Sequence, residues 1–248
     1  MNNILEIEGL SKSYDGKKNA LNDCNFSLEK GEICAIVGES GSGKTTLLRL
    51  IAGLERPTNG CIKINGQLVS SDSQITPPQK RQIGMVFQDY ALFPHMTVKQ
   101  NIGFGLKNPS NNEIHDLLNL IKMNSYADAY PSELSGGQEQ RVAIARTLAL
   151  KPNLLLLDEP FSNLDVGLKS DLRKEIQSIS KELNTSLIFI THDLYDAIEI
   201  ADKIIFLKDG IMLQNSSVRD FVTTENTEIK KMISNLTSNA NQLLNLID

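Results

Sequence analysis

Several features are scarce or missing in this chain of 248 residues, which has no tryptophan and in which only 5% of residues are aromatic. The longest purely aliphatic stretch is Leu154 to Leu157, far short of the ~20 apolar residues that span a bilayer. The residues after Met1 show no basic region followed by an apolar core, which excludes a secretory signal peptide. We therefore expect the chain to stay in the cytosol.

Cysteine and basic charge are also in short supply. Cys24, Cys34 and Cys61 are odd in number and lack the spacing of metal ligands, so we expect reduced thiols with structural roles. The formal net charge is −5 and there is no block of basic residues, which argues against nucleic acid as the main partner. With 40% hydrophobic and 22% charged residues, the composition is that of a soluble globular protein.

The hydrophobic patterns predict an α/β fold. Asn65-Gly66 is a strong hairpin signal because both positions of such a turn need positive φ. From residue 138 onward helices and strands alternate, which is typical of βαβ units in a parallel sheet. The predicted N-terminal elements are strands at 4–10, 24–28, 33–37 and 83–87 and a helix at 44–52. The predicted C-terminal elements are a helix at 138–150, a strand at 154–157, a helix at 166–183, a strand at 187–190, a helix at 194–201 and a strand at 203–207.

Two segments depart from this alternation. Residues from about 89 to 134 carry helical patterns broken by polar loops that contain proline, which predicts an inserted helical subdomain. The tail over 215–248 is polar and rich in Asn, Ser and Thr, with weak helices predicted near 217–222 and 225–236. The sequence therefore predicts one domain over 1–214 and a short helical tail.

A phosphate-binding motif lies between the predicted strand at 33–37 and the helix that follows it. Glycines permit a tight loop whose amide hydrogens converge on phosphate oxygens, and the helix N-terminus adds the positive end of its dipole. Lys44 is placed to reach the β and γ phosphates of a nucleotide, and the Thr45 hydroxyl can ligate Mg²⁺. The predicted nucleotide-contacting residues here are Gly38, Glu39, Ser40, Gly41, Ser42, Gly43, Lys44, Thr45 and Thr46. We call residues 38–45 the phosphate loop.

An acidic pair follows the apolar strand at 154–157. Asp158 emerges at the C-terminal edge of this strand, where ligands bind in open α/β sheets, and can hold Mg²⁺. Glu159 is placed to orient or deprotonate an attacking water. By itself such a pair is more often a helix cap or a solvated turn, but a phosphate loop in the same chain favours the catalytic interpretation.

A second glycine-rich loop, Leu134-Ser135-Gly136-Gly137-Gln138, precedes another apolar-faced helix and so provides another N-terminus able to receive an anion. Most loops of this kind are only loops. Together with the phosphate loop and the acidic strand end, however, this one resembles the signature loop of ABC transporter ATP-binding subunits. Further short motifs match that family in the same order along residues 1–214. These are Tyr14, Gln88 after the strand at 83–87, Ser162 to Asp165, and Thr191-His192-Asp193.

The resemblance implies a P-loop NTPase fold with a mostly parallel sheet, an N-terminal antiparallel β subdomain and an inserted α-helical subdomain. It implies ATP and Mg²⁺ as cofactors and a head-to-tail pair of chains that share two ATP sites. Tyr14 would then stack on adenine. The signature loop, Ser135, Gly136, Gly137 and Gln138, would contact the ATP of the second copy, and Asp165 would also contact nucleotide. The implied catalytic set is Glu159, His192, Lys44 and Gln88, and the implied metal ligands are Thr45, Gln88 and Asp158.

Two features depart from the family pattern. Asn163 stands where many members carry a small alanine. Many import ATPases of the most similar type also carry a β-rich regulatory domain of about 100 residues after the ATPase domain. We expect that domain to be absent because few residues follow position 214.

The segment from Gln88 to Val98 resembles bacterial importers of ferric iron, polyamines, sulfate and similar solutes. This resemblance implies docking to integral membrane permease subunits on the inner face of the cell membrane, with Tyr90, Leu92, Phe93 and Met96 half-exposed for the contact. A periplasmic or extracellular solute-binding protein would take part indirectly. Ferric iron is the first substrate expected.

Two rival functions are open at the level of sequence. A soluble ABC-type ATPase could remodel ribosomes, DNA or metal-cluster assemblies, but such proteins usually have two tandem ATPase halves, a long coiled-coil insertion or basic surfaces. None of these is visible in the sequence. A small-molecule kinase with a phosphate loop would leave residues 134–138 unexplained.

Overall fold

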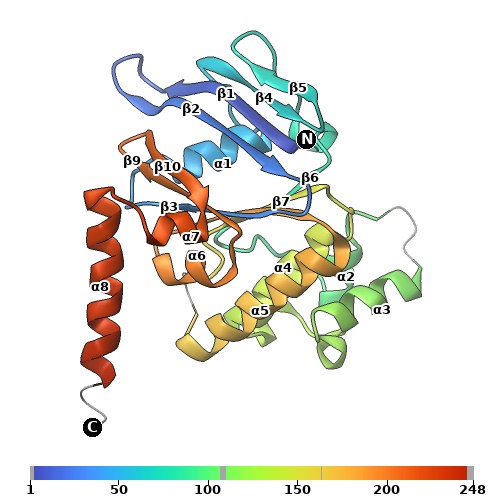
Figure 1. Cartoon of the computed structure of the whole chain (residues 1–248). Coiled ribbons are helices and arrows are strands. Elements are labelled where there is room, and N and C mark those ends of the chain that lie inside the picture. The colour runs from blue at the N-terminus through green and yellow to red at the C-terminus, as the bar shows by residue number, and fades with distance from the viewer. Residues whose placement is uncertain (1–2, 107–109, 163, 245–248) are drawn as a thin grey trace.

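Figure 1 shows the computed structural model of the chain, which describes residues 3–106, 110–162 and 164–244. An antiparallel sheet forms one layer, a mostly parallel sheet lies beneath it, and most helices cover the opposite face of the second sheet. The predicted α/β architecture is confirmed. Among the described residues, no helix is long and apolar enough to pass through a bilayer.

The antiparallel sheet is built from two hairpins in the order β2-β1-β4-β5. The β1–β2 hairpin turns at residues 14–18, where Tyr14 lies, and the β4–β5 hairpin turns at Asn65-Gly66. Asn65 and Gly66 have φ of 50° and 72°, which confirms the turn predicted from their sequence. The strands are β1 (Asn3–Ser13), β2 (Asn19–Glu29), β4 (Asn59–Ile64) and β5 (Gln67–Ser71).

The second sheet has the order β10-β9-β3-β8-β7-β6, and all neighbouring strands are parallel except β10 and β9. Every residue of β3 and β8 is buried, because this sheet is covered on both faces. Alternate residues of β3 therefore enter two different cores, Ala35 below the sheet and Ile36 above it. The strands are β3 (Ile33–Val37), β6 (Ile83–Val86), β7 (Leu154–Asp158), β8 (Ser186–Thr191), β9 (Lys203–Lys208) and β10 (Ile211–Ser217).

Helix α1 (Lys44–Ala52) lies between the two sheets and ends at Gly53, whose φ of 79° is the left-handed cap expected from the sequence. The Arg81 guanidinium donates to the carbonyl oxygens of Leu50 (3.1 Å) and Ile51 (2.8 Å), so it satisfies the end of the helix. Burial lowers the pKa of Arg81 to about 10.

Helices α2 to α6 lie on the lower face of the second sheet (Figure 1). The insertion contains α2 and α3, and each begins with a capping box, at Thr97 and Ser110 respectively. The bounds are α2 (Val98–Gly103), α3 (Asn111–Leu120), α4 (Gly136–Leu148), α5 (Val166–Leu183) and α6 (Leu194–Ile200), with short 3₁₀ helices at Pro78–Lys80, Asn124–Tyr126 and Pro131–Glu133.

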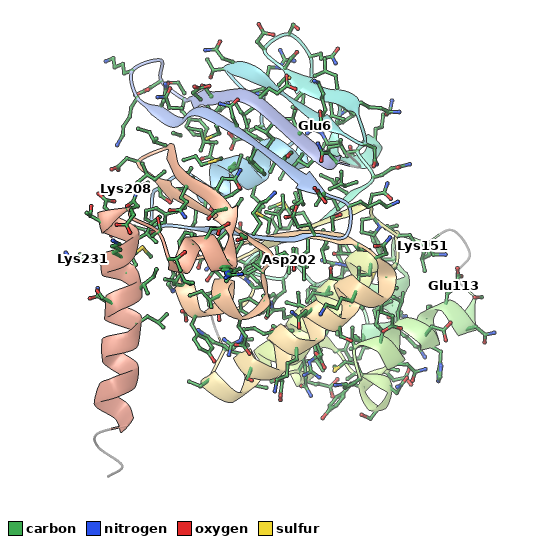
Figure 2. All side chains as sticks on the ribbon, viewed as in Figure 1. Glu6, Glu113, Lys151, Asp202, Lys208 and Lys231 are labelled. Carbon is green, nitrogen blue, oxygen red and sulfur yellow. The ribbon has the colours of Figure 1, made fainter. Side chains whose placement is uncertain are left out.

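The C-terminal part contains a strand that the sequence analysis did not predict. β10 pairs with β9 across Asp209-Gly210, and the predicted boundary after residue 214 falls inside it. Helices α7 (Val218–Val222) and α8 (Thr227–Leu244) follow. Lys208 at the end of β9 forms an ion pair with Glu228 of α8 at 2.5 Å, and Figure 2 shows this lysine beside the start of that helix.

Candidate nucleotide site

The parallel sheet brings three loops to one edge. Val37 pairs with Thr191, so the phosphate loop after β3 and His192 after β8 leave the sheet side by side. Asp158 at the end of β7 pairs with Ile190, which brings the acidic strand end to the same edge. The carboxyl edge of a parallel sheet is the position at which such folds bind ligands.

The phosphate loop requires glycine at two of its positions. A Cβ on Gly38 would lie 2.1 Å from the carbonyl oxygen of Leu207. Gly43 has a φ of 104°, and a Cβ there would lie 2.4 Å from the carbonyl oxygen of Ala20. The loop is thus held against its neighbours with no room for a side chain at these two points.

Lys44 is folded back onto the phosphate loop. Its ammonium group donates to the carbonyl oxygens of Gly38 (2.7 Å) and Glu39 (2.9 Å). Burial lowers the pKa of Lys44, while the nearby Glu159 and Asp158 carboxylates act in the opposite direction. These three side chains therefore lie within electrostatic range of one another. An anionic ligand would offer the ammonium group a stronger partner than the two carbonyls.

The other residues of the loop divide into a buried and an exposed set. The Ser42 hydroxyl is buried and has no hydrogen-bond partner within the part of the chain that the structure describes. Glu39, Ser40, Gly41 and Thr45 are exposed, so their polar groups are accessible to a ligand. A buried hydroxyl without a partner costs free energy, and a phosphate oxygen could serve as its acceptor.

Tyr14 and Thr46 connect the antiparallel sheet with helix α1. The Tyr14 hydroxyl lies 3.4 Å from Thr46 Oγ1, and the ring is 61% exposed. The Lys12 ammonium lies 5.0 Å from the centroid of the ring. The ring therefore lies beside the first turn of α1, with a large area free for stacking. Its contact with adenine stays a prediction.

The acidic pair combines a carboxylate with a raised pKa and a residue with an uncommon backbone conformation. Burial raises the pKa of Asp158, and the adjacent Glu159 carboxylate raises it further. Glu159 has a φ of 48°, a left-handed conformation that is uncommon for a residue with a side chain. His192 Nδ1 lies 3.5 Å from Glu159 Oε2, so the structure brings these two side chains together.

The chemistry of the donors fits Mg²⁺. Asp158 and Thr45 offer hard oxygen ligands, and the raised pKa of Asp158 shows that its charge lacks full compensation from Lys44 and Arg49. Among the described residues, no group of three or more His, Cys, Asp or Glu side chains is arranged to hold a metal. A cation here would therefore complete its shell with phosphate oxygens and water, as Mg²⁺ commonly does.

Gln88 leaves the sheet next to the acidic strand end. It follows β6, whose Val86 pairs with Leu157 of β7, while β7 and β8 separate it from β3. Its side chain is exposed, and no hydrogen bond within the described residues joins it to Lys44, Thr45 or Asp158. Its roles in metal binding and catalysis stay predictions.

The signature loop forms the N-terminus of α4. Ser135 Oγ accepts from the Gln138 amide (3.4 Å), and Gln138 Oε1 accepts from the Ser135 amide (2.8 Å). The amides of Gly136 and Gly137 lie in the first turn, where the helix itself offers no acceptors. Within the described part of the chain no hydrogen bond or ion pair joins this loop to the phosphate loop.

Asp165 is the N-cap of α5, because its carboxylate accepts from the Leu168 amide at 2.9 Å. This contact gives the residue a structural role alongside the predicted nucleotide contact. Asn163, two positions earlier, lies outside the described residues.

Three contacts near the site were not predicted from the sequence. Arg146 of α4 donates to the carbonyl oxygens of Ala91 (2.8 Å) and Tyr90 (3.0 Å), and Gln140 Nε2 donates to the carbonyl oxygen of Pro160. The Gly210 amide donates to the carbonyl oxygen of Ser42 at 3.0 Å, so the β9–β10 turn supports the phosphate loop. All three join residues more than fifteen positions apart, and no local sequence pattern encodes them. The Asp209-Gly210 pair is a recognisable turn signal.

Comparison with known proteins supports one family. The family model described as ABC transporter matches residues 21–162. A sulfate/thiosulfate import ATP-binding protein from Cucumis sativus is 44% identical over 226 residues, which cover 87% of this chain and 63% of that protein. An Fe(3+) ions import ATP-binding protein from Pseudomonas fluorescens is 47% identical over 216 residues, which cover 86% of this chain and 61% of that protein. The chain thus spans less than two thirds of the length of these relatives.

Solved structures agree with the sequence relatives. The cbiO1 protein from Clostridium perfringens, described as part of the ABC transporter complex cbiONQ, has a TM-score of 0.82 and 31% identity. The match covers 98% of this chain and 99% of that one. The ATP-binding cassette MJ0796, solved as a dimer bound to ADP and Pi, has a TM-score of 0.75 and 30% identity, with coverage of 87% and 99%.

Proposed function

We propose, because this chain belongs to the ABC transporter family, that it hydrolyses ATP to power the import of a solute through a membrane permease. The observation that carries the proposal is the convergence of Lys44, Asp158 and the Glu159–His192 pair at one edge of the sheet. The signature loop is a second anion-accepting helix terminus that has no partner loop within the described chain.

Each residue of this edge has a chemical role in the proposal. Lys44 leaves the carbonyls of the phosphate loop and binds the terminal phosphates of ATP, which it neutralises. Thr45 and Asp158 would hold Mg²⁺, which would supply further neutralisation of the phosphate charge. Glu159 orients or deprotonates the attacking water, and His192 contacts the γ-phosphate from the adjacent strand end.

The active unit in the proposal is a pair of chains. Each phosphate loop receives the signature loop of the second copy, so that the γ-phosphate lies between two helix N-termini. The dimeric cassette MJ0796, which was solved with ADP and Pi, supports this arrangement by similarity. Closure of the pair upon ATP binding is the movement that would drive transport.

The loop from Gln88 to Met96 is the proposed contact with the permease. Tyr90, Leu92, Phe93 and Met96 are half-buried, and Tyr90 and Leu92 pack partly against the main core. Phe93 stacks at 4.3 Å between ring centroids on Phe104, which is exposed. These side chains form an apolar surface that packs on the main core. Such a surface is suited to bind a short helix of a membrane subunit.

The substrate is a solute of the ferric iron, sulfate or polyamine group. Relatives named as importers of each of these kinds share 41% to 47% identity with this chain. Ferric iron is the first candidate to test. No residue of this chain contacts the solute in the proposal, because the permease and an external binding protein select it. Because these relatives are named as import subunits, transport is favoured over the rival role in remodelling soluble assemblies.

The test is hydrolysis by Glu159→Gln. Phosphate release in the presence of Mg²⁺ should fall at least ~100-fold, because the water loses its base. The variant should also accumulate as an ATP-bound dimer, seen as a larger species in gel filtration with ATP and absent with ADP. Near-normal turnover would remove Glu159 from the mechanism, and an inactive wild-type chain would contradict the proposed function.

A further inference from the structure

A buried polar network lies directly beneath His192. Thr191, the last residue of β8, is buried, and its hydroxyl donates to Asp196 Oδ2 at 3.3 Å. The same hydroxyl accepts from the amide of Asp193 at 3.0 Å. The two residues that flank His192 are thus joined to each other through one side chain, and that side chain is held by Asp196.

Asp196 is in turn held by an arginine from another helix. It is 0% exposed and lies on α6, and its Oδ1 accepts from Nη1 of Arg173 of α5 at 2.6 Å. Arg173 is also buried, and its Nε lies 2.6 Å from Glu199 Oε2. Its guanidinium lies 4.9 Å from the centroid of the Tyr195 ring. The guanidinium is therefore fixed from three sides.

His192 itself has little support of its own. Its side chain is 60% exposed, and the one ion-pair partner it has in the described chain, Glu159, lies 3.5 Å away. An exposed imidazole with a single long contact needs a fixed backbone if it is to reach the same phosphate position in each turnover. The network below supplies that fixed backbone.

Simple structural support does not account for the network. The N-terminus of α6 is already capped, because the Asp193 carboxylate accepts from the Tyr195 amide at 2.9 Å. A buried ion pair is a weak source of stability, and apolar residues of similar volume often serve a core better. The buried Arg173–Asp196 pair instead holds the Thr191 hydroxyl next to His192, which suggests that it fixes the orientation of His192.

We propose that Thr191, Asp196 and Arg173 are positioning residues that hold His192 at the γ-phosphate. The inference rests on the proposed hydrolysis of ATP. None of the three touches the nucleotide. They act through the backbone of residues 191–193.

Thr191→Val tests this, since valine keeps the shape of threonine and removes the hydroxyl. We expect kcat for ATP hydrolysis to fall about tenfold, because the imidazole is less well oriented, with the KM for ATP nearly unchanged. Thr191→Ser restores the hydroxyl and should restore most of kcat. Asp171→Asn is the matched control, because it changes an exposed carboxylate of α5 and leaves Thr191, Asp196 and Arg173 in place.

A double-mutant cycle separates positioning from general damage. In a His192→Ala background, Thr191→Val should have no further effect on single-turnover hydrolysis, because both changes act through the same group. Additive losses, or equal losses in Thr191→Val and Asp171→Asn, would overturn the inference. Nucleotide binding and the thermal midpoint of each variant report whether it is folded. A wild-type chain without ATPase activity would contradict the proposed function instead.

Discussion

At the scale of single residues, Asp158 carries its charge in an unfavourable place. Burial and the neighbouring Glu159 raise its pKa above the ordinary 3.8, and Lys44 and Arg49 offset this only in part. A group whose pKa is raised on folding destabilises the folded state once it ionises, so this cost is present at neutral pH. The cost fits a residue kept for ligand binding.

We therefore predict that Asp158→Asn raises the thermal midpoint at pH 7 in the absence of nucleotide while it abolishes hydrolysis. A gain of about 1 kcal/mol corresponds to roughly 2–4 °C for a chain of this size. The gain should become smaller as the pH falls toward the ordinary pKa of an aspartate, because Asp158 then binds a proton in both the folded and the unfolded chain. The exposed Asp171→Asn is the control. Thermal melts at several pH values measure the effect, and a lower midpoint at pH 7 would contradict it.

Local spacing predicted some of these residues well and others not at all. The run from Gly38 to Thr45 follows an apolar strand, and the structure places it at the sheet edge beside Asp158 and His192. Arg146 and Arg173 gave no such signal, because their partners lie on other elements and depend on tertiary packing. Residues that support a site are thus harder to predict than residues that form it.

At the scale of elements, α4 is a rigid connection between two proposed functions. It begins at the signature loop and carries Arg146 about ten residues later, a length of roughly 15 Å at 1.5 Å per residue. Arg146 holds the carbonyl oxygens of Tyr90 and Ala91, whose φ values of 60° and 46° are both left-handed. The guanidinium stabilises a loop conformation that the backbone itself disfavours.

Arg146→Ala should loosen this loop. Hydrogen exchange of the amides over 88–93 should become at least about tenfold faster, because each lost bond to a charged donor contributes ~1.5–3 kcal/mol. Exchange over the first turns of α4 should be unchanged. Arg141→Ala on the same helix is the control, since that side chain pairs with Glu175 and not with the loop. Unchanged exchange over 88–93 would remove the proposed connection.

The periodicity of apolar residues predicted most helices and strands, but it did not predict β10. The alternation of helices and strands after residue 138 gave the parallel sheet, because each buried strand is a short apolar run. β10 (Ile211–Ser217) was not predicted because it is a half-exposed edge strand of mixed polarity. Its turn, Asp209-Gly210, has φ values of 47° and 78° and is the kind of pair that marks a hairpin. Greater weight on that turn would have predicted the strand.

At the scale of the whole molecule, the chain presents two half-sites. The phosphate loop, Asp158, Glu159 and His192 share one edge, whereas the signature loop forms no hydrogen bond or ion pair with them among the described residues. Sequence patterns identified both loops, but their separation within one chain is a property of the fold. We propose that these two half-sites meet only between two copies of the chain.

Mixing two inactive variants tests this claim most directly. Lys44→Met disables the phosphate loop, and Ser135→Asp keeps the cap of α4 while it places a negative charge where the γ-phosphate would bind. In a mixed head-to-tail dimer, one site combines both defects and the other combines two intact halves. Phosphate release should therefore reappear on mixing, up to about a quarter of the wild-type rate for equal amounts and independent sites. A mixture that stays as inactive as each variant alone would contradict the account.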